Sequence, residues 1–461
     1  MAPVSIANNE LLGRRLLHFL GGDNMNNRTK LKTLFGMIII CLFLSASLGA
    51  AASGNAVSTP QKREGHCIQV LDKGKWAPDT YKSVQNLIDK HGAGSTGYDP
   101  NRKPYVVFDW DHTSIMNDTE EALFLYQIDH LAYNMQPEEF YEVIKKNVPN
   151  GPFSHEFKNL QGDAVTLKQI AEDLKRDYEF LYSNYNGMNG KERLESLHST
   201  DQFKDFKAKM YFLYEAIGET YGVEIGYPWV LYLFANMSTE EVQQLAEASN
   251  DYNLGAAMAS VTLISPGSML GKAGTVQVTY TTGLRLASEI ANLMHTFMEN
   301  GIDVYVISAS MEEVVEVFSS NPKYGYNLPK ENVFGMRLKK KEGITQAEYE
   351  DNWPITAREG KVEVIEQAIS KTRGGYGPIF VAGDSSTDYE MLTIKSLKLG
   401  LIINRLKTGD IGKLAKTAAE RMGKNNPKYV LQGRNENTGL WIPTEYTIKL
   451  GSNEEKLLAN P

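Results

Sequence analysis

The sequence predicts an α/β fold in which a Rossmann-like parallel sheet, flanked by helices, carries a large inserted helical domain. Compact apolar runs recur at residues 105–108, 304–307, 379–382 and 399–403, as in strands that are buried on both faces. Helical patterns separate these runs, which favours a parallel sheet. Nearly two hundred residues lie between the first run and the second, so we expect this gap to hold a further domain.

The composition of the chain excludes several classes of protein. With 461 residues, of which 42% are hydrophobic and 23% charged, the chain has enough apolar material for a full core. The net charge of −8 argues against nucleic acid as a partner, because proteins that bind it neutralise phosphates with a basic face. The two cysteines, Cys41 and Cys67, exclude a disulfide framework and a zinc site of the CxxC type.

Residues 1–52 have the pattern of a leader with a secretory signal peptide. Basic residues follow Met25, an apolar stretch covers residues 34–44, and small residues lead up to Ala52, after which we expect cleavage. Met25 is an alternative start, because the region in front of such a signal is normally short. The apolar stretch is well short of the roughly 20 residues that a membrane-spanning helix needs. We therefore expect an exported protein, in a bacterial periplasm or secreted, with no stable membrane insertion after cleavage.

The rest of the chain divides into three expected parts. Residues 53–103 are polar and punctuated by Gly and Pro, and we expect them to form an N-terminal extension packed on the core. Residues 118–280 form the inserted helical domain. The catalytic core then consists of residues 104–117 and 281–461.

Helices are expected at four places outside the apolar runs. One lies at residues 81–90, and one begins at Ser238, where Glu241 completes a capping box. An amphipathic helix between Gly283 and Gly301 returns the chain to the sheet. The last lies near residues 411–422.

Polar side chains follow the first apolar run directly. Asp109, Asp111 and Thr113 stand at alternate positions just after residue 108. Because the carboxyl ends of parallel strands open onto one crevice, we expect these side chains to meet the polar groups that follow the other strands.

Three further signals lie at or near the ends of later elements. Ser308 closes the second apolar run and Ala309 follows it, while Lys361 stands where a helical pattern begins. Asp384 and Asp388 come directly after the third run. Each signal alone is typical of a turn or a solvated charge, but together and at strand ends they indicate a site.

This set of side chains suits phosphoryl transfer. Carboxylates at the ends of two strands can hold Mg²⁺, a hard ion that prefers oxygen ligands. An aspartate can form a covalent aspartyl phosphate, and a second acid can protonate the leaving oxygen and later activate water. A lysine neutralises the phosphate together with the ion, and hydroxyls and backbone N–H groups supply further donors.

The motifs resemble those of haloacid dehalogenase superfamily phosphatases, and the insertion after the first strand resembles the C1 cap of that superfamily. The resemblance implies Asp109 as the nucleophile and Asp111 as the general acid and base. The groups implied to bind the phosphate are Thr113, Ser308, Ala309 and Lys361.

The same resemblance implies a magnesium site. The implied ligands of the ion are the carboxylate of Asp109, the backbone carbonyl of Asp111 and the carboxylate of Asp384. Asp388 is implied to orient these ligands without binding the ion itself. An aspartate at position 111 is what separates the phosphatases of this superfamily from its dehalogenases.

The substrate is expected to be a small phosphomonoester with an amine-bearing leaving group. In phosphoserine phosphatases, which share the C1 arrangement, an acid nine residues after the nucleophile meets the ammonium group, and that position is Asp118 here. The stretch 109–121, with Glu120 and Glu121, also resembles exported bacterial phosphorylcholine phosphatases, as do residues 308–310 and 333–338.

These acids also have structural interpretations. Asp118 suits the N-cap of a helix, and Glu120 and Glu121 suit its solvated first turn. A quaternary ammonium group calls for aromatic faces beside a negative charge, and residues 118–236 are rich in aromatic side chains. The candidates for such contacts are Tyr126, Tyr133, Tyr227 and Trp229.

The expected function is that of an exported, Mg²⁺-dependent phosphomonoesterase whose substrate resembles phosphocholine. A phosphoserine-type or broad-specificity acid phosphatase is the alternative within the enzymes. Outside them, the alternative is a non-catalytic choline or phospho-ligand binding protein on the same fold, against which the intact acids at 109, 111, 384 and 388 argue.

Overall fold

A computed structural model describes residues 69–459 of the chain. The expected signal peptide, its cleavage site at Ala52 and both cysteines lie outside these residues. Within the described residues, no helix combines the length and the apolar character needed to cross a membrane.

A six-stranded sheet forms the centre of the fold, with the order β12-β11-β10-β1-β6-β7 and parallel pairing throughout. The four apolar runs all form strands of this sheet, as predicted. The two outermost strands, β7 and β12, were not predicted. The strands are β1 (Tyr105–Phe108), β6 (Asp303–Met311), β7 (Val333–Met336), β10 (Phe380–Gly383), β11 (Leu399–Ile403) and β12 (Tyr429–Gln432).

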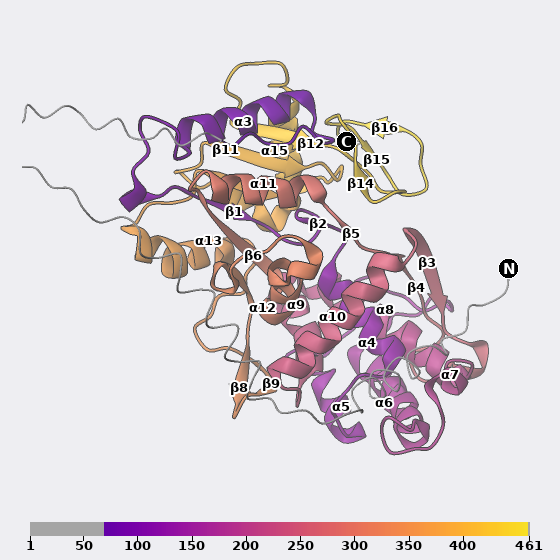
Figure 1. The fold of residues 1–461 in the computed structure, drawn as a ribbon. Helices are drawn as coiled ribbons and strands as arrows, with labels where there is room; N and C mark the ends of the chain where they lie inside the picture. Colours follow the sequence, from indigo (N-terminus) through magenta and orange to yellow (C-terminus); the bar gives the residue numbers. More distant parts are fainter. Residues whose placement is uncertain (1–68, 460–461) are drawn as a thin grey trace, which may run out of the picture. The chain divides into compact units, whose positions relative to one another are not determined.

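Both faces of the sheet are covered by helices. Along β1, Val106 and Phe108 point into one apolar cluster, and Tyr105 and Val107 point into the other, because successive side chains of a strand face opposite ways. The first face is covered by α3 (Pro78–His91), α11 (Ser288–Glu299) and α12 (Glu312–Ser320), and the second by α13 (Glu359–Val364), α14 (Tyr389–Leu392) and α15 (Gly409–Ala419). Figure 1 shows α3 and α11 lying along the sheet.

The helix that returns the chain to the sheet begins later than predicted. It starts at Ser288, because Arg285–Leu286 (β5) pairs with Ile115–Met116 (β2) as a short antiparallel ladder. This ladder places the segment that leads from the sheet into the insertion beside the segment that leads back.

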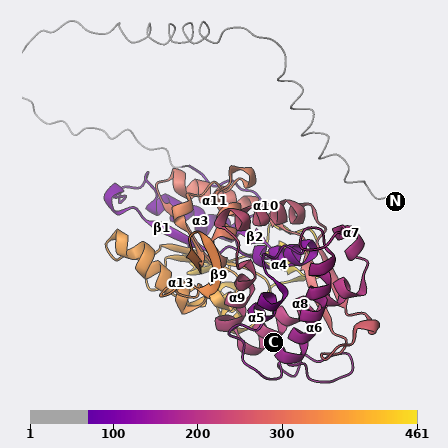
Figure 2. The same cartoon turned by 90° about the horizontal axis from the view of Figure 1, so that it is seen from below.

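The insertion is built mainly of helices around its own apolar cluster. Its helices are α4 (Thr119–His130), α5 (Pro137–Val143), α6 (Leu167–Asn184), α7 (Leu194–Leu197), α8 (Asp201–Tyr221), α9 (Val223–Leu231) and α10 (Thr239–Gly255). The capping box at the start of α10 is present, since Ser238 and Glu241 bond to each other's backbone N–H groups. Figure 2 shows α4, α5, α6 and α8 grouped away from α3 and α13.

A β-hairpin closes the insertion, which the helical expectation did not include. It consists of β3 (Ala259–Ile264) and β4 (Gln277–Thr282). The expected boundary at residue 280 falls inside β4, so the hairpin runs two residues past it. We refer below to the helices α4–α10 with this hairpin as the cap.

Two further pieces of sheet lie outside the central one. The hairpin of β8 (Leu338–Lys341) and β9 (Ile344–Tyr349) is tied to the cap through backbone bonds of Thr345 to Asn236 and Met237. After β12, the chain forms a small sheet in which β13 (Arg434–Asn435) is central, with β14 (Leu440–Trp441), β15 (Thr447–Ile448) and β16 (Glu455–Lys456).

Candidate active site

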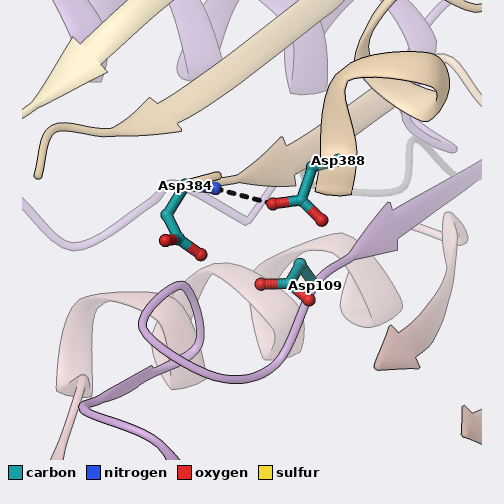
Figure 3. Close-up of side chains that lie close together, drawn as sticks. All are labelled: Asp109, Asp384 and Asp388. Atoms are coloured by element: carbon teal, nitrogen blue, oxygen red, sulfur yellow. Dashed lines mark hydrogen bonds between the residues drawn. The ribbon is translucent and has the colours of Figure 1, made fainter. Parts of the chain in front are cut away.

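Three buried aspartates lie together at the carboxyl ends of two neighbouring strands. Asp109 follows β1, while Asp384 and Asp388 follow β10. One carboxylate oxygen from each lies within 4.8 Å of the others. Figure 3 shows the carboxylates of Asp109 and Asp384 turned toward each other, and Asp388 beside the backbone of Asp384. The sequence-based expectation that these acids converge is met in the structure.

The turn after β1 sets the direction of its polar side chains. His112 and Asn117 have positive φ angles of 60° and 66°, and the N–H of His112 donates to the carbonyl of Asn117. The carbonyl of Trp110 accepts from the N–H groups of residues 113–115. The backbone of this turn is therefore held by its own hydrogen bonds.

Lys361 connects the two groups of acids. Its Nζ lies 2.5 Å from Oδ1 of Asp109 and 2.7 Å from Oδ1 of Asp388, and its side chain is fully buried. Burial alone would lower the pKa of Lys361, but the two carboxylates outweigh it and raise the pKa above its usual range. The lysine is thus a permanent positive charge beside Asp109.

Asp388 holds the second strand end in place. Its Oδ2 accepts the backbone N–H groups of Asp384 and Ser385. Gly383 makes this approach feasible, because a Cβ there would lie 2.6 Å from Cβ of Asp388. With both oxygens engaged by donors, Asp388 has the supporting position that the resemblance implied.

Asp111 is surrounded by hydroxyl groups. Its Oδ1 accepts the N–H and the Oγ1–H of Thr119 at 2.7 and 2.5 Å, and its Oδ2 accepts Ser310 Oγ at 2.6 Å and Ser308 Oγ at 3.2 Å. Burial raises the pKa of Asp111, and these hydrogen bonds oppose the rise. A carboxyl with a raised pKa is suited to give and take a proton near neutral pH.

Thr113 and Ser308 lie deeper than phosphate ligands would. The Thr113 hydroxyl is buried and donates to Oδ1 of Asp384 at 2.9 Å. Ser308 is likewise buried, and its Oγ accepts the N–H of Ser310. Their hydroxyls orient Asp384 and Asp111, and the phosphate-binding role expected for Thr113 and Ser308 stays a prediction. Ala309 and Ser310 line the open cavity, and the phosphate-binding role expected for Ala309 stays a prediction.

The acids fit a divalent cation. Burial and the neighbouring charge of Asp388 raise the pKa of Asp109, and a bound cation relieves this crowding of negative charge. Among the described residues, neither Oδ2 of Asp109 nor the backbone oxygen of Asp111 accepts a hydrogen bond. These oxygens and the carboxylate of Asp384 are the groups that would hold Mg²⁺.

Arg405 also contacts this group of acids and was not predicted. It stands two residues after β11, and its Nη1 lies 2.6 Å from Oδ2 of Asp384. Burial acts to raise the pKa of Asp384, but the guanidinium outweighs it and holds the pKa below its usual range. The strand-end rule that found the other residues would have found Arg405, since it follows the run at 399–403 in the same way.

A cavity of about 410 Å³ lies over Asp109 and Asp111, between the core and the cap. The core wall includes Ser310, Asp384 and Arg405. The cap wall includes Asp118, Glu121, Tyr214, Glu215, Tyr227 and Val230.

The three acids after the first motif have different surroundings. Asp118 caps α4 by accepting the N–H of Glu121, and it also lines the cavity, so both of its expected roles are compatible with the structure. Glu120 accepts the N–H of Met311, and Glu121 accepts the hydroxyl of Tyr211. The alternative of a solvated first turn is therefore wrong for Glu120, which is buried, whereas Glu121 is half-buried and lines both cavities.

The cap wall is acidic where it faces the cavity. Burial is the main cause that raises the pKa values of Asp118 and Glu121, and it raises the pKa of Glu215 to about 7. None of these three carboxylates forms a salt bridge with a lysine or arginine among the described residues. An additional cation entering the cavity would relieve their mutual repulsion.

Of the four aromatic candidates, two are structural. Tyr133 packs edge-on against Phe140 and Tyr178 in the cap interior, and Trp229 is buried with its indole N–H donated to the carbonyl of Ile144. Tyr227 lines the cavity described above. Tyr126 lines a second cavity.

This second cavity, of about 550 Å³, adjoins the first. The two share lining residues from both core and cap, namely His112, Asp118, Glu121, Glu215 and Arg405. The far wall of the second cavity carries Tyr126, Tyr252 and Tyr280 from the cap, and Arg434 and Lys449 from the small C-terminal sheet.

Comparison with known proteins gives relatives of two kinds. No protein-family model matches the chain. The phosphorylcholine phosphatase of Pseudomonas aeruginosa is 28% identical over 240 residues, which are 44% of this chain and 62% of that protein, so the chain spans less than two thirds of that relative. A conserved, functionally unknown protein from Anaerococcus prevotii is 36% identical; its crystal structure matches with a TM-score of 0.77 over 84% of this chain and 99% of that one.

Proposed function

The chain belongs to the phosphatases of the haloacid dehalogenase superfamily, and on that premise we propose that it hydrolyses a small phosphomonoester through an aspartyl-phosphate intermediate. The observation that carries the proposal is the placement of Asp109 between Lys361 and the carboxylate of Asp384, with the protonatable Asp111 two residues away. The nucleophile and the proton donor thus face one cavity, and the fixed positive charge of Lys361 is buried beside Asp109.

The first step uses Asp109 and Asp111. A carboxylate oxygen of Asp109 attacks phosphorus, the bond between phosphorus and the leaving oxygen breaks, and Asp111 gives its proton to that oxygen. Lys361 stays beside the Asp109 carboxylate throughout and offsets the negative charge of the incoming phosphate.

The second step reverses the role of Asp111. Now a carboxylate, it takes a proton from water, and the hydroxide attacks the phosphorus of the aspartyl phosphate. Inorganic phosphate leaves, Asp109 returns as a carboxylate and Asp111 is protonated again. The hydroxyls of Thr119 and Ser310 hold Asp111 in one orientation for both steps.

The proposal includes Mg²⁺ as the cofactor. When bound, the ion supplies positive charge to the phosphate oxygens and screens Asp109 from the phosphate. The residues that would hold it are Asp109, Asp384 and the backbone carbonyl of Asp111.

For the substrate, we propose a phosphomonoester whose alcohol carries an amine or quaternary ammonium group, with phosphocholine as the leading example. The acidic cap wall of Asp118, Glu121 and Glu215, with the ring of Tyr227 beside it, supports a cationic leaving group. The similarity to a phosphorylcholine phosphatase supports the same assignment.

A second substrate class has its own support. Arg405 and Lys407 also line the cavity. In a leaving group that carries both an amine and a carboxylate, the carboxylate would bind these two bases while the amine faces the acidic cap wall. A phosphorylated amino acid such as phosphoserine is therefore the second candidate.

A substrate panel tests the proposal. Purified protein lacking residues 1–52 is assayed with phosphocholine, phosphoserine and glycerol phosphate, with Mg²⁺ and after treatment with EDTA. We expect phosphocholine to have the highest kcat/KM and EDTA to remove activity. A preference for glycerol phosphate, whose alcohol is neutral, would contradict the assignment of the acidic wall. Asp109→Asn serves as the inactive control.

The proposed location is outside the cytoplasm, in the periplasm of a bacterium or in the medium. The support is the signal-peptide pattern before Ala52. N-terminal sequencing of protein recovered from the periplasm or medium tests this, and recovery of the full-length chain from the cytoplasm would contradict it.

A further inference from the structure

Arg405 brings a second fixed positive charge to the acids of the active site. Its guanidinium lies 2.6 Å from Oδ2 of Asp384, and only 15% of its side chain is exposed. The other oxygen of Asp384 accepts the hydroxyl of Thr113. Both oxygens of the carboxylate implied to hold the metal therefore already have donors.

The charges at the site are close to balance. Asp109, Asp384 and Asp388 carry three negative charges, and Lys361 and Arg405 carry two positive ones when all are ionised. Lys361 is bonded to Asp109 and Asp388, and among the described residues Arg405 is the one side chain that forms a salt bridge with Asp384. A divalent cation that binds Asp384 has to do so against the repulsion of this guanidinium.

The contact between Arg405 and Asp384 can be released. Among the described residues, Nη1 makes its hydrogen bond to Asp384, while the buried Nε has no partner. The side chain lines both cavities, where Asp118 and Glu121 are the nearby acids. If the guanidinium leaves Asp384, it therefore still has acidic side chains nearby and does not enter an apolar environment.

We propose that Arg405 is a tethered cation that competes with the divalent metal ion for Asp384 and so sets the metal affinity of the enzyme. This inference rests on the proposed function, because it assigns Asp384 to the metal. Arg405 is a positioning residue that acts through Asp384. Its charge keeps the site stable without metal and weakens metal binding in the absence of substrate.

Isothermal titration of metal-free protein with Mg²⁺ tests the proposal. Arg405→Gln removes the competing charge, and Lys407→Gln is the matched control, because Lys407 lines the same cavity two residues away and forms no salt bridge with Asp384. We expect the Kd for Mg²⁺ to fall by about tenfold in Arg405→Gln and by less than about twofold in Lys407→Gln. The unfolding temperature of the metal-free protein should fall in Arg405→Gln and recover with Mg²⁺.

A Kd in Arg405→Gln that equals or exceeds that of the native protein overturns the proposal, because a role in holding Asp384 in place would weaken metal binding. Arg405→Met, which retains the aliphatic volume, replaces the glutamine variant if that variant does not fold. If the native protein binds Mg²⁺ and hydrolyses phosphocholine but neither variant binds more tightly, only the role of Arg405 fails. If no protein binds Mg²⁺, the metal requirement of the proposed function fails with it.

Discussion

Thr119 donates both its backbone N–H and its hydroxyl to one oxygen of Asp111, at 2.7 and 2.5 Å. Asp111 belongs to the turn after β1, and Thr119 is the first residue of α4, where the chain enters the cap. Asp111, the proposed general acid, is therefore oriented by the first turn of the cap. The position of that helix and the protonation of Asp111 are coupled through this pair.

Removal of the Thr119 hydroxyl should shift the pH dependence of catalysis. Hydrogen bonds to a carboxylate favour its charged form, so Thr119→Val removes one of the groups that hold down the pKa of Asp111. The pKa then rises, and the pH profile of kcat moves to higher pH. Thr119→Ser, which retains a hydroxyl, should keep the native profile. A shift to lower pH in the valine variant would contradict this account of Asp111.

Glu215 should control the affinity for a cationic leaving group in a pH-dependent way. Burial raises its pKa to about 7, so it is neutral below that pH and negative above it. KM for phosphocholine should therefore fall as pH rises through about 7, and Glu215→Gln should abolish this fall and raise KM several-fold at pH 8.

Two controls accompany that measurement. KM for glycerol phosphate should not change in Glu215→Gln, because its alcohol is neutral. Glu224 is exposed in α9 and lines neither cavity, so Glu224→Gln should behave as the native protein. An equal change in KM for both substrates would mean that Glu215 shapes the cavity without binding a cation.

Glu120 should matter for stability through its hydrogen bond and not through its charge. Burial raises its pKa to about 8, and its Oε2 accepts the N–H of Met311 at 2.9 Å. At pH 6 the side chain is neutral, so Glu120→Gln should change the free energy of unfolding by less than about 1 kcal/mol. Glu120→Ala leaves the buried N–H of Met311 unpaired and should cost about 1–3 kcal/mol. Urea denaturation measures both, and equal losses would contradict the assignment.

Asp177 should make the cap less stable at high pH. Asp177 Oδ2 and Asp205 Oδ1 are buried atoms with no donor among the described residues, and burial and the hydrogen bond shared with Asp205 raise the pKa of Asp177 to about 8. A carboxyl whose pKa is raised by folding contributes stability below its unfolded pKa of about 4, and this is lost as pH rises through the folded value.

The measurement is the unfolding temperature from about pH 6 to pH 9. In the native protein it should fall as pH rises from about 6 to about 8 and level off above that, and in Asp177→Asn the fall should be smaller, because an amide donates the shared hydrogen bond at any pH. Asp163, which is exposed and forms no salt bridge in the described chain, provides the control variant Asp163→Asn. An identical pH dependence in all three proteins would show that no proton is shared.

The sequence was most informative where a residue's position relative to a strand end decides its role. The acids after residues 105–108 and 379–382 could be placed at one edge of the sheet because buried parallel strands have continuous apolar runs. The edge strands β7 and β12 were not predicted, since each of these four-residue strands has only three apolar side chains.

The side chains that face the site from the cap could not be chosen from the sequence. Trp229 and Tyr227 are two residues apart on one helix, yet the first is in the cap interior and the second lines the cavity. Glu120 and Glu121 both suit a solvated helical turn by sequence, but their actual hydrogen-bond partners, Met311 and Tyr211, are distant in sequence. Such contacts follow from how the cap packs on the core.

The most direct test of the account is to trap the intermediate. The enzyme is mixed with phosphocholine and Mg²⁺, quenched in acid within one turnover, digested, and its peptides are weighed by mass spectrometry. The account predicts one added phosphoryl group on the peptide that contains Asp109, and none in Asp109→Asn. Hydrolysis at the native rate by the Asp109→Asn variant, or a phosphoryl group on another residue, would contradict it.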